Sequence, residues 1–504
     1  MAFEKNVFLT AKKVFLPKQQ LSVECNVMAG QDIKKVLSVS VQADVCGKEA
    51  LDGILNISGN MIVSLIFLTE EDEVCTVASK CPFSSKIENT AIGKGQCALV
   101  NIDVLETETQ LPGGDSVRIN VSALQYGFVV ENQENEMLCC SGEDVCYQNE
   151  DVEIIKFVGC QKDSALFESE INLRGDVKKV LTVESQVIVK SAESGTNYVS
   201  VAGETVSKVL YINQNDKIEN GWVYDSFKQE IEFDGACRDD LVEGFAQIRA
   251  EGVESEIVAQ EQSGKLVIKI PVDFLAVAYR KENVSIVKDL FGLKEEINLS
   301  YQSYEMTSAC PVEIIEGKID GSLTLDEDKP RVDKLLYSGA NKVSLTNHYF
   351  KDGQLYVEGI AQTTVVYLND DSSAIYSVIV DVPFVLSDKV GCSLDEQVFL
   401  NAIICDADVV VKKGRELLFD AKIKVSVYCN EKMVGGVIST AQTGESYPQK
   451  NYAMEVVFAK KGMSVWDVAK LVKEQEEKIV AQNPDVVFPT EENTPIVLYY
   501  QRVQ

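Results

Sequence analysis

The chain has 504 residues, 45% of them hydrophobic and 25% charged, which is typical of a folded globular protein with several domains and excludes a largely disordered or fibrous chain. Its 78 acidic and 48 basic residues give a formal net charge of -30, which disfavours partners such as nucleic acid or an anionic membrane surface. The chain has one histidine, His348, so a multi-histidine metal site is excluded, and Ser-His or Cys-His catalysis would depend on that residue alone. We therefore expect a protein that is not an enzyme.

The N-terminal part of the chain gives no sign of export. Its first twenty residues carry charges and lack an apolar stretch of signal-peptide length, and the most apolar window, Met61 to Leu68, is too short to span a membrane. The cysteines form no CxxC pair and cluster only at Cys139, Cys140 and Cys146, so we interpret them as free thiols and not as zinc ligands. The sequence predicts a cytoplasmic protein without membrane insertion, metal or cofactor.

An internal repeat organises most of the chain. The segment DIKKVLSV, which begins at Asp32, recurs 144 residues later as DVKKVLTV at Asp176, and a weaker copy, VDKLLYS, begins at Val332. Self-similarity at a fixed period indicates tandem copies of one structural unit, here of about 150 residues. We expect three copies, over residues 1–150, 151–300 and 301–438. The motif itself could be an exposed binding site around Lys34 and Lys35, but its repetition favours a role in the fold.

Two sets of glycines keep the same order as the motif. The first set opens an apolar strand in each copy, at Gly59, Gly203 and Gly359. The second set precedes a strand of alternating apolar and polar residues, at Gly114, Gly264 and Gly414. Alternation of this kind, separated by turn residues, is typical of strands with one buried face. The fold class predicted is mainly β, with three tandem sandwich or barrel-like domains.

The last part of the chain has a different pattern. Residues 439–450 are weakly hydrophobic and are predicted to be a linker, and a short strand follows at Glu455 to Ala459. Ser464 stands three residues before Asp467, a spacing typical of a capping box at a helix start. A second helix is expected over Glu476 to Gln482, because proline at position 484 disfavours helical backbone before it. A final strand at residues 495–500 completes a β-α-α-β module over residues 451–504.

The terminal module resembles the LysM family in two segments. Gly462 to Trp466 (GMSVW) is similar to the turn into the first LysM helix, and Ile479 to Asp485 (IVAQNPD) is similar to the end of the second. The resemblance implies a ligand groove between these segments. Its walls would be formed by Gly462, Met463, Ser464 and Val465 on one side, and by Asn483, Pro484, Asp485 and Val486 on the other.

Two kinds of ligand remain open for that groove. LysM domains bind N-acetyl sugars, which implies peptidoglycan as one partner. Met463, however, replaces an acidic residue of the family pattern, and an adaptable apolar side chain suits a protein surface. Met463 and Val465 are the positions that we expect to contact a partner. Ser464 and Asn483 are also the residue types that cap helices, and Trp466 fits a core position.

The three repeats resemble SPOCS domains, a family linked to endospore formation. A run of such domains followed by one LysM domain is similar to a family of spore-morphogenesis proteins. The resemblance implies a scaffold or adaptor in the mother-cell cytoplasm, located at the forespore surface and spore coat. Its implied partner is the spore-coat basement ATPase or another coat protein, and the alternative is a peptidoglycan-binding protein acting through the LysM groove.

Overall fold

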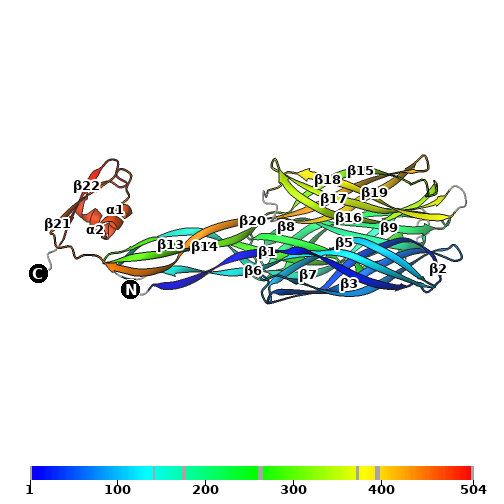
Figure 1. Ribbon diagram of the computed structural model, residues 1–504, viewed down its shortest axis with the longest axis horizontal. Helices are drawn as coiled ribbons and strands as arrows, with labels where there is room; N and C mark the ends of the chain where they lie inside the picture. The colour runs from blue at the N-terminus through cyan, green and yellow to red at the C-terminus, as the bar shows by residue number, and fades with distance from the viewer. Residues whose placement is uncertain are drawn as a thin grey trace.

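The computed structural model describes residues 3–139, 142, 144–172, 177–258, 265–369, 374–391 and 398–500. The described chain is mainly β, as predicted, and its strands form several separate sheets. Figure 1 shows a broad β body, a narrower stalk of long strands and a small C-terminal module at the end of the stalk. No helix in the described ranges has the length and apolar character needed to cross a membrane. Asp176, Gly264 and Cys140, which were singled out in the sequence, lie outside the described residues.

The first six strands form two facing sheets, which we call the first sheet pair (residues 4–139). Its strands are β1 (Glu4–Met28), β2 (Ile33–Leu51), β3 (Ile54–Thr69), β4 (Val74–Glu88), β5 (Cys97–Gly113) and β6 (Ser116–Cys139). The sheets have the antiparallel orders β1-β6-β5 and β2-β3-β4. Alternate side chains of both sheets, such as Val63 and Val121, are fully buried in one apolar cluster between them. This is the expected consequence of period-two alternation.

The second and third sheet pairs repeat this arrangement. The second (residues 145–292) contains β7 (Val145–Asn172), β8 (Val177–Gly195), β9 (Tyr198–Asn213), β10 (Ile218–Glu232), β11 (Leu241–Ile248), the short 3-10 helix η1 (Ala250–Gly252), β12 (Glu254–Val258) and β13 (Lys265–Gly292). The third (residues 295–446) contains β14 (Glu295–Ala309), β15 (Glu313–Thr324), β16 (Val332–Lys351), β17 (Gln354–Asn369), β18 (Ile375–Asp388), β19 (Val398–Lys412) and β20 (Glu416–Ser446). In each, a three-stranded sheet, β10-β9-β8 or β16-β17-β18, faces a sheet built around β13 or β20.

The predicted boundaries do not coincide with the ends of the strands. Positions 150, 300 and 438 fall inside β7, β14 and β20 respectively. The predicted linker over 439–450 is wrong for residues 439–446, because β20 continues to Ser446, which is opposite Glu295 of β14. This end of β20 is mostly solvent-exposed, so its side chains are polar although its backbone is paired. Low hydrophobicity therefore marks an exposed ribbon here and not a loop.

The repeated glycines Gly59, Gly203 and Gly359 have a common structural reason. Each lies opposite an irregularity in the neighbouring strand, between Val45 and Gly47, Val189 and Ser191, or Leu345 and Asn347. Each also lies beneath the ring of a phenylalanine in the next strand, namely Phe83, Phe227 or Phe384. A side chain at the glycine would meet both the ring and a backbone carbonyl, so only glycine fits.

We expect Gly203→Ala to destabilise the protein by about 1–3 kcal/mol, because an added Cβ would lie 2.7 Å from Cζ of Phe227 and also against the carbonyl oxygen of Ile188. Denaturant unfolding followed by circular dichroism measures the change. Gly436→Ala is the matched control, since Gly436 lies in β20 with no heavy atom within 4 Å of an added Cβ. Equal stability of the two variants would contradict this explanation of the repeat.

The three sheet pairs are packed together and share a core. Three aromatic rings, one from each pair, meet there: Phe128 lies 5.3 Å from Phe245 and 5.7 Å from Phe399 between ring centroids, and Phe245 and Phe399 lie 6.0 Å apart. These rings belong to one buried cluster to which all three pairs contribute. The pairs are therefore packed side by side around a common interior, and Figure 1 shows them together in the body.

The DIKKVLSV motif contributes to a second shared cluster. Leu37 and Leu181, at matching positions of two copies, are buried with Tyr337 of the third. Lys34 is exposed and pairs with Asp72, whereas half-buried Lys35 donates to the carbonyl oxygen of Ile375 in the third sheet pair. The interpretation of the motif as part of the fold is thus confirmed for its apolar positions.

Candidate functional site

The terminal module follows the predicted order of elements. It contains β21 (Met454–Ala459), α1 (Val465–Val472), α2 (Glu476–Gln482) and β22 (Thr494–Tyr499), and β21 pairs with β22. Ser464 is the N-cap of α1: its Oγ accepts a hydrogen bond from the Asp467 amide at 3.2 Å, and Asp467 Oδ2 accepts one from the Ser464 amide at 2.8 Å. The predicted capping box is confirmed. The pKa of Asp467 lies below its usual value, because its carboxylate accepts from the Ser464 hydroxyl at 2.7 Å and from the Ser464 amide.

Helix α1 fixes the module to the end of the stalk. The buried ring of Trp466 packs edge-on against Phe291 of β13, with ring centroids 5.0 Å apart. Asp289, also in β13, accepts a hydrogen bond from Trp466 Nε1 at 3.0 Å and forms an ion pair with Lys470 at 2.7 Å. The hydrogen bonds from these two donors lower the pKa of Asp289, although its partial burial acts in the opposite direction. Trp466 is thus a core residue, as predicted, and it also anchors the module.

The first predicted wall lies next to the stretch that follows α2, four residues beyond the second wall. The link is Thr490, whose carbonyl oxygen accepts from the Gly462 amide at 2.7 Å and whose amide donates to the Met463 carbonyl oxygen at 3.0 Å. Sequence reasoning missed Thr490, because no pattern marks a backbone bridge between two loops. The turn and the stretch after α2 therefore form one continuous surface.

The eight predicted wall residues differ in exposure. Exposed positions are Gly462, Pro484 and Asp485, partly buried ones are Met463, Ser464, Val465 and Val486, and Asn483 is buried. The Asn483 side chain donates to the carbonyl oxygens of Ile479 and Val497 and accepts from the Val497 amide at 2.8 Å. Asn483 and Ser464 thus hold the module together, while Met463, Val465 and Val486 remain partly accessible apolar side chains.

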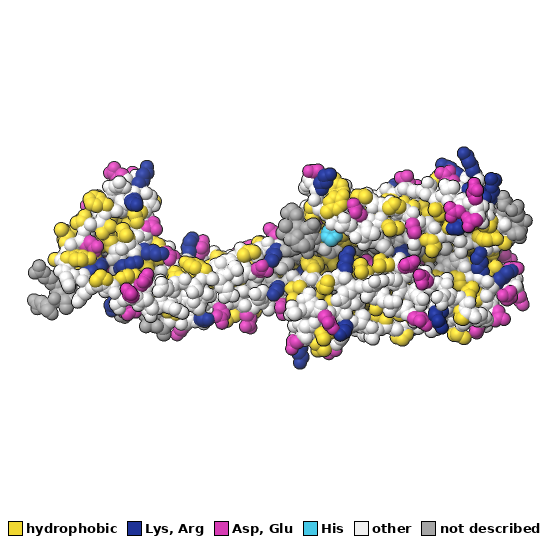
Figure 2. Space-filling model, in the orientation of Figure 1, with side chains coloured by type: hydrophobic (Ala, Val, Ile, Leu, Met, Phe, Trp, Pro, Cys, Tyr) yellow, Lys and Arg dark blue, Asp and Glu magenta, His cyan; other side chains and the backbone are white. Residues whose placement is uncertain are grey.

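The module also has an exposed apolar face that the sequence analysis did not identify. Met454, Val456 and Phe458 alternate along β21 and point away from the helices, with exposed fractions of 53%, 46% and 67%. Tyr499 of β22 lies directly opposite Met454 and is 58% exposed. Hydrophobic side chains gather on the module in Figure 2. The signal in the sequence was that apolar residues occupy both alternating sets of positions in MEVVFA.

A second candidate site is a cavity of about 680 Å³ between the three sheet pairs. The strands that contribute to its wall include β2 and β5 of the first pair, β8 and β11 of the second, and β16 and β19 of the third. Its charged lining residues are Lys48, Asp103, Lys162, Asp163, Glu184, Asp273 and Lys342. Because the wall combines strands distant in sequence, we call it the central cavity.

The carboxylates of the central cavity are held by neighbouring donors. Asp103 accepts a hydrogen bond from the Tyr126 hydroxyl at 2.9 Å, and burial raises the pKa of Asp103 to about 6. Glu184 accepts from the Ala340 amide at 3.0 Å and so joins β8 to β16, while burial raises its pKa as well. Because these hydrogen bonds join β5 to β6 and β8 to β16, both carboxylates stabilise the fold.

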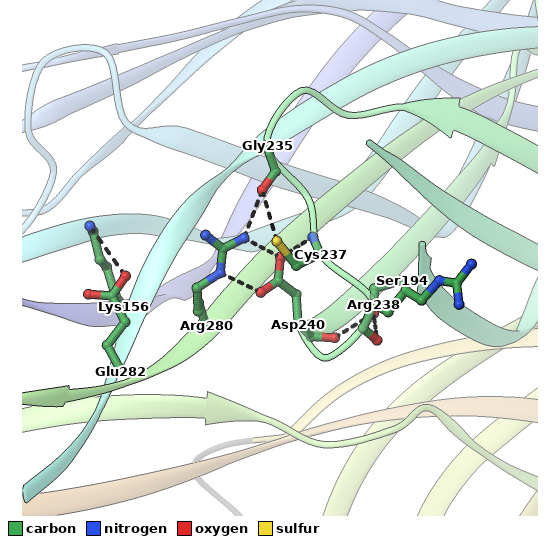
Figure 3. A network of polar contacts seen from close by, with 8 residues as sticks. All are labelled: Lys156, Ser194, Gly235, Cys237, Arg238, Asp240, Arg280 and Glu282. Atoms are coloured by element: carbon green, nitrogen blue, oxygen red, sulfur yellow. Dashed lines mark hydrogen bonds and ion pairs between the residues drawn. The ribbon is translucent and has the colours of Figure 1, made fainter. Parts of the chain in front are cut away.

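A polar network fixes the start of β11, which lines the central cavity. Arg280 of β13 donates to both carboxylate oxygens of Asp240, at 2.7 and 2.8 Å, and to the carbonyl oxygen of Gly235 at 2.7 Å. The Cys237 amide donates to Asp240 at 2.7 Å, and Ser194 of β8 donates to the Asp240 carbonyl oxygen (Figure 3). Asp240 also raises the pKa of Arg280 further above its usual value. This bidentate pair holds the loop before β11 in place.

Comparisons with known proteins assign no family to the chain. No protein-family model, no curated protein and no solved structure matches it. The resemblance of the repeats and of the module to known families therefore stays a prediction from the sequence.

Proposed function

We propose that the chain is a non-enzymatic adaptor of spore-coat assembly, similar to SipL-like spore-morphogenesis proteins, whose terminal module docks on a protein partner. The proposal rests on the segments Gly462 to Trp466 and Ile479 to Asp485, which resemble LysM, and on the repeated DIKKVLSV motif, which resembles SPOCS. By the same resemblance the partner is the spore-coat basement ATPase or another coat protein, met in the mother-cell cytoplasm at the forespore surface.

The observation that carries this proposal is the apolar surface of the module. Partly accessible Met463 and Val465 lie on one predicted wall, and Val487, just beyond the other wall, is 74% exposed. Contiguous exposed apolar side chains commonly mark protein interaction sites. The module is also nearly neutral, with six basic and eight acidic residues from position 451 onward, so most of the net negative charge lies on the body. A protein surface fits such a module better than a polar sugar does.

Arginine substitutions in the wall should test this docking surface. We expect Met463→Arg combined with Val465→Arg to reduce capture of the basement ATPase from sporulating cells at least tenfold, because two charges would have to be buried on binding. Leu471→Arg is the matched control: Leu471 is an exposed apolar residue of α1 outside both walls. Unchanged capture by the wall variant, with its circular dichroism spectrum intact, would contradict the site.

The same variants separate docking on protein from binding to glycan. If the groove binds peptidoglycan instead, the full chain should sediment with purified sacculi, and soluble N-acetylglucosamine oligomers should compete. Sedimentation lost in the wall variant and kept in Leu471→Arg would replace protein docking by glycan binding as the function of the module.

A further inference from the structure

The central cavity combines a size and a position that suit a small ligand. Its volume of about 680 Å³ lies within the range of about 300–1,000 Å³ that is typical of ligand pockets. All three sheet pairs contribute to its wall, so an occupant would contact each of them. This inference does not depend on the function proposed for the terminal module.

Two cationic side chains of the cavity form no ion pair with a described residue. Lys48 of β2 and Lys162 of β7 both line it, and among the described residues neither ammonium group has a hydrogen bond or an ion pair. The pKa of Lys48 is lowered chiefly by burial and further by the positive charge of Lys162, which means that the two groups face the same space. Two unpaired like charges at one place favour the binding of an anion.

Each carboxylate in the same wall accepts a hydrogen bond from another group, although the negative charge of Asp273 also raises the pKa of Lys48 against the larger effect of burial. Asp273 is paired with Arg249 at 2.8 Å, and Asp163 accepts from Gln229 at 2.8 Å. Asp103 and Glu184 are engaged with Tyr126 and with backbone amides, as described above. The third lysine, Lys342, donates to the Leu105 carbonyl oxygen at 2.6 Å. Lys48 and Lys162 are therefore the two lysines of the cavity wall whose ammonium groups can still donate hydrogen bonds to a ligand.

An apolar wall lies directly beside Lys162. Phe245 of β11 is opposite Leu275 of β13, and Leu275 is opposite Lys162 of β7, so the three side chains are aligned across neighbouring strands on one face of the sheet. Phe399 and Tyr428, from the third sheet pair, extend this apolar wall within the cavity. Lys162 is exposed and Phe245 is buried, so the cavity changes from cationic near solvent to apolar in its interior.

We propose that the central cavity binds an amphiphilic carboxylate, with the carboxylate group between Lys48 and Lys162 and the hydrocarbon body against Phe245, Leu275 and Phe399. Charge-assisted hydrogen bonds from the two ammonium groups fix the anionic end, and burial of the chain supplies most of the affinity. Because the ligand touches all three sheet pairs, its binding also stabilises the body.

Titration calorimetry of the full chain with dodecanoate tests this assignment. We expect saturable binding of dodecanoate and an increase in unfolding temperature with its concentration, whereas dodecanol, with the same chain but no charge, should bind at least tenfold more weakly. Inorganic phosphate should bind more weakly still, because it lacks an apolar body. Equal binding of dodecanoate and dodecanol, or binding of phosphate alone, would overturn the proposal.

Substitutions locate the site. Lys48→Gln and Lys162→Gln should each weaken dodecanoate binding at least tenfold, and Gln247→Trp, on the same face of β11 as Phe245, should fill the cavity and abolish binding. Lys86→Gln is the control, because Lys86 is an exposed lysine of β4 that pairs with Glu88. Dodecanoate affinity that is the same in the control and in all three cavity variants would rule out this cavity as the site. Circular dichroism shows that each variant is folded before it is titrated.

Discussion

Replacing Lys13 by methionine is expected to lower the free energy of unfolding by about 3–5 kcal/mol, because it leaves the buried carboxylate of Glu243 without a counter-charge. The two side chains have exposed fractions of 0% and 1%, and Lys13 Nζ lies 2.8 and 2.9 Å from the carboxylate oxygens. Tyr279 and Asn430 also donate to Glu243, at 2.9 and 3.1 Å. The network joins strands of all three sheet pairs, so its loss should weaken the whole body.

A double-mutant cycle separates the charge from the rest of the side chain. Adding Glu243→Gln to Lys13→Met removes the stranded charge and should recover a large part of the lost stability, so the two effects are not additive. Lys5→Met is the matched control on β1, since the exposed pair Lys5 and Glu136 should contribute less than about 1 kcal/mol. Urea unfolding monitored by circular dichroism gives the free energy of unfolding of the four proteins in the cycle: the parent, Lys13→Met, Glu243→Gln and the double variant. Strictly additive losses would show that Lys13 stabilises only through its hydrocarbon chain.

Replacing Trp466 by alanine is expected to cost the terminal module about 3–5 kcal/mol and to release it from the stalk. Trp466 is 6% exposed and provides both the ring contact with Phe291 and the hydrogen bond to Asp289. Limited proteolysis should then cleave between β20 and the end of the chain at concentrations of protease that leave the parent intact. Small-angle scattering should show a broader distribution of dimensions for the variant.

Two milder variants separate the contribution of the Trp466 ring from those of its hydrogen bond and of the neighbouring ion pair. Trp466→Phe keeps an aromatic ring against Phe291 but loses the donor to Asp289, so we expect a loss of about 1–3 kcal/mol, as for a hydrogen bond to a charged group. Lys470→Ala removes only a half-exposed ion pair with Asp289 and should cost less than about 1 kcal/mol. If Trp466→Ala is as resistant to protease as Lys470→Ala, the ring does not anchor the module.

Local patterns in the sequence predicted the terminal module well. The strand expected at Glu455 to Ala459 begins one residue earlier, and the helix expected over Glu476 to Gln482 has those bounds. Capping boxes and proline positions are local signals, so they can be read without knowledge of the fold. The repeated glycines were also visible, but the reason for them, a bulge and a phenylalanine on neighbouring strands, depends on strand register and could not be predicted.

The shared interior of the three sheet pairs could not be predicted either. Lys13, Glu243 and Asn430 are far apart in the chain, and nothing in their local sequence indicates that they meet. The same holds for the central cavity, where Lys48 and Lys162 come from different sheet pairs. The exposed end of β20 was predicted to be a linker, because a paired ribbon with polar side chains has the composition of a linker.

The stalk gives the molecule two distinct poles. The N-terminus and the terminal module both lie at the stalk end, whereas the turns between β1 and β2, between β3 and β4 and between β5 and β6 lie at the other (Figure 1). A protein bound to the module would be separated from the β body by the length of the stalk, and the far end of the body would remain accessible to other partners. If the module docks as proposed, one molecule would therefore hold two successive layers of an assembly at a distance set by the length of the stalk.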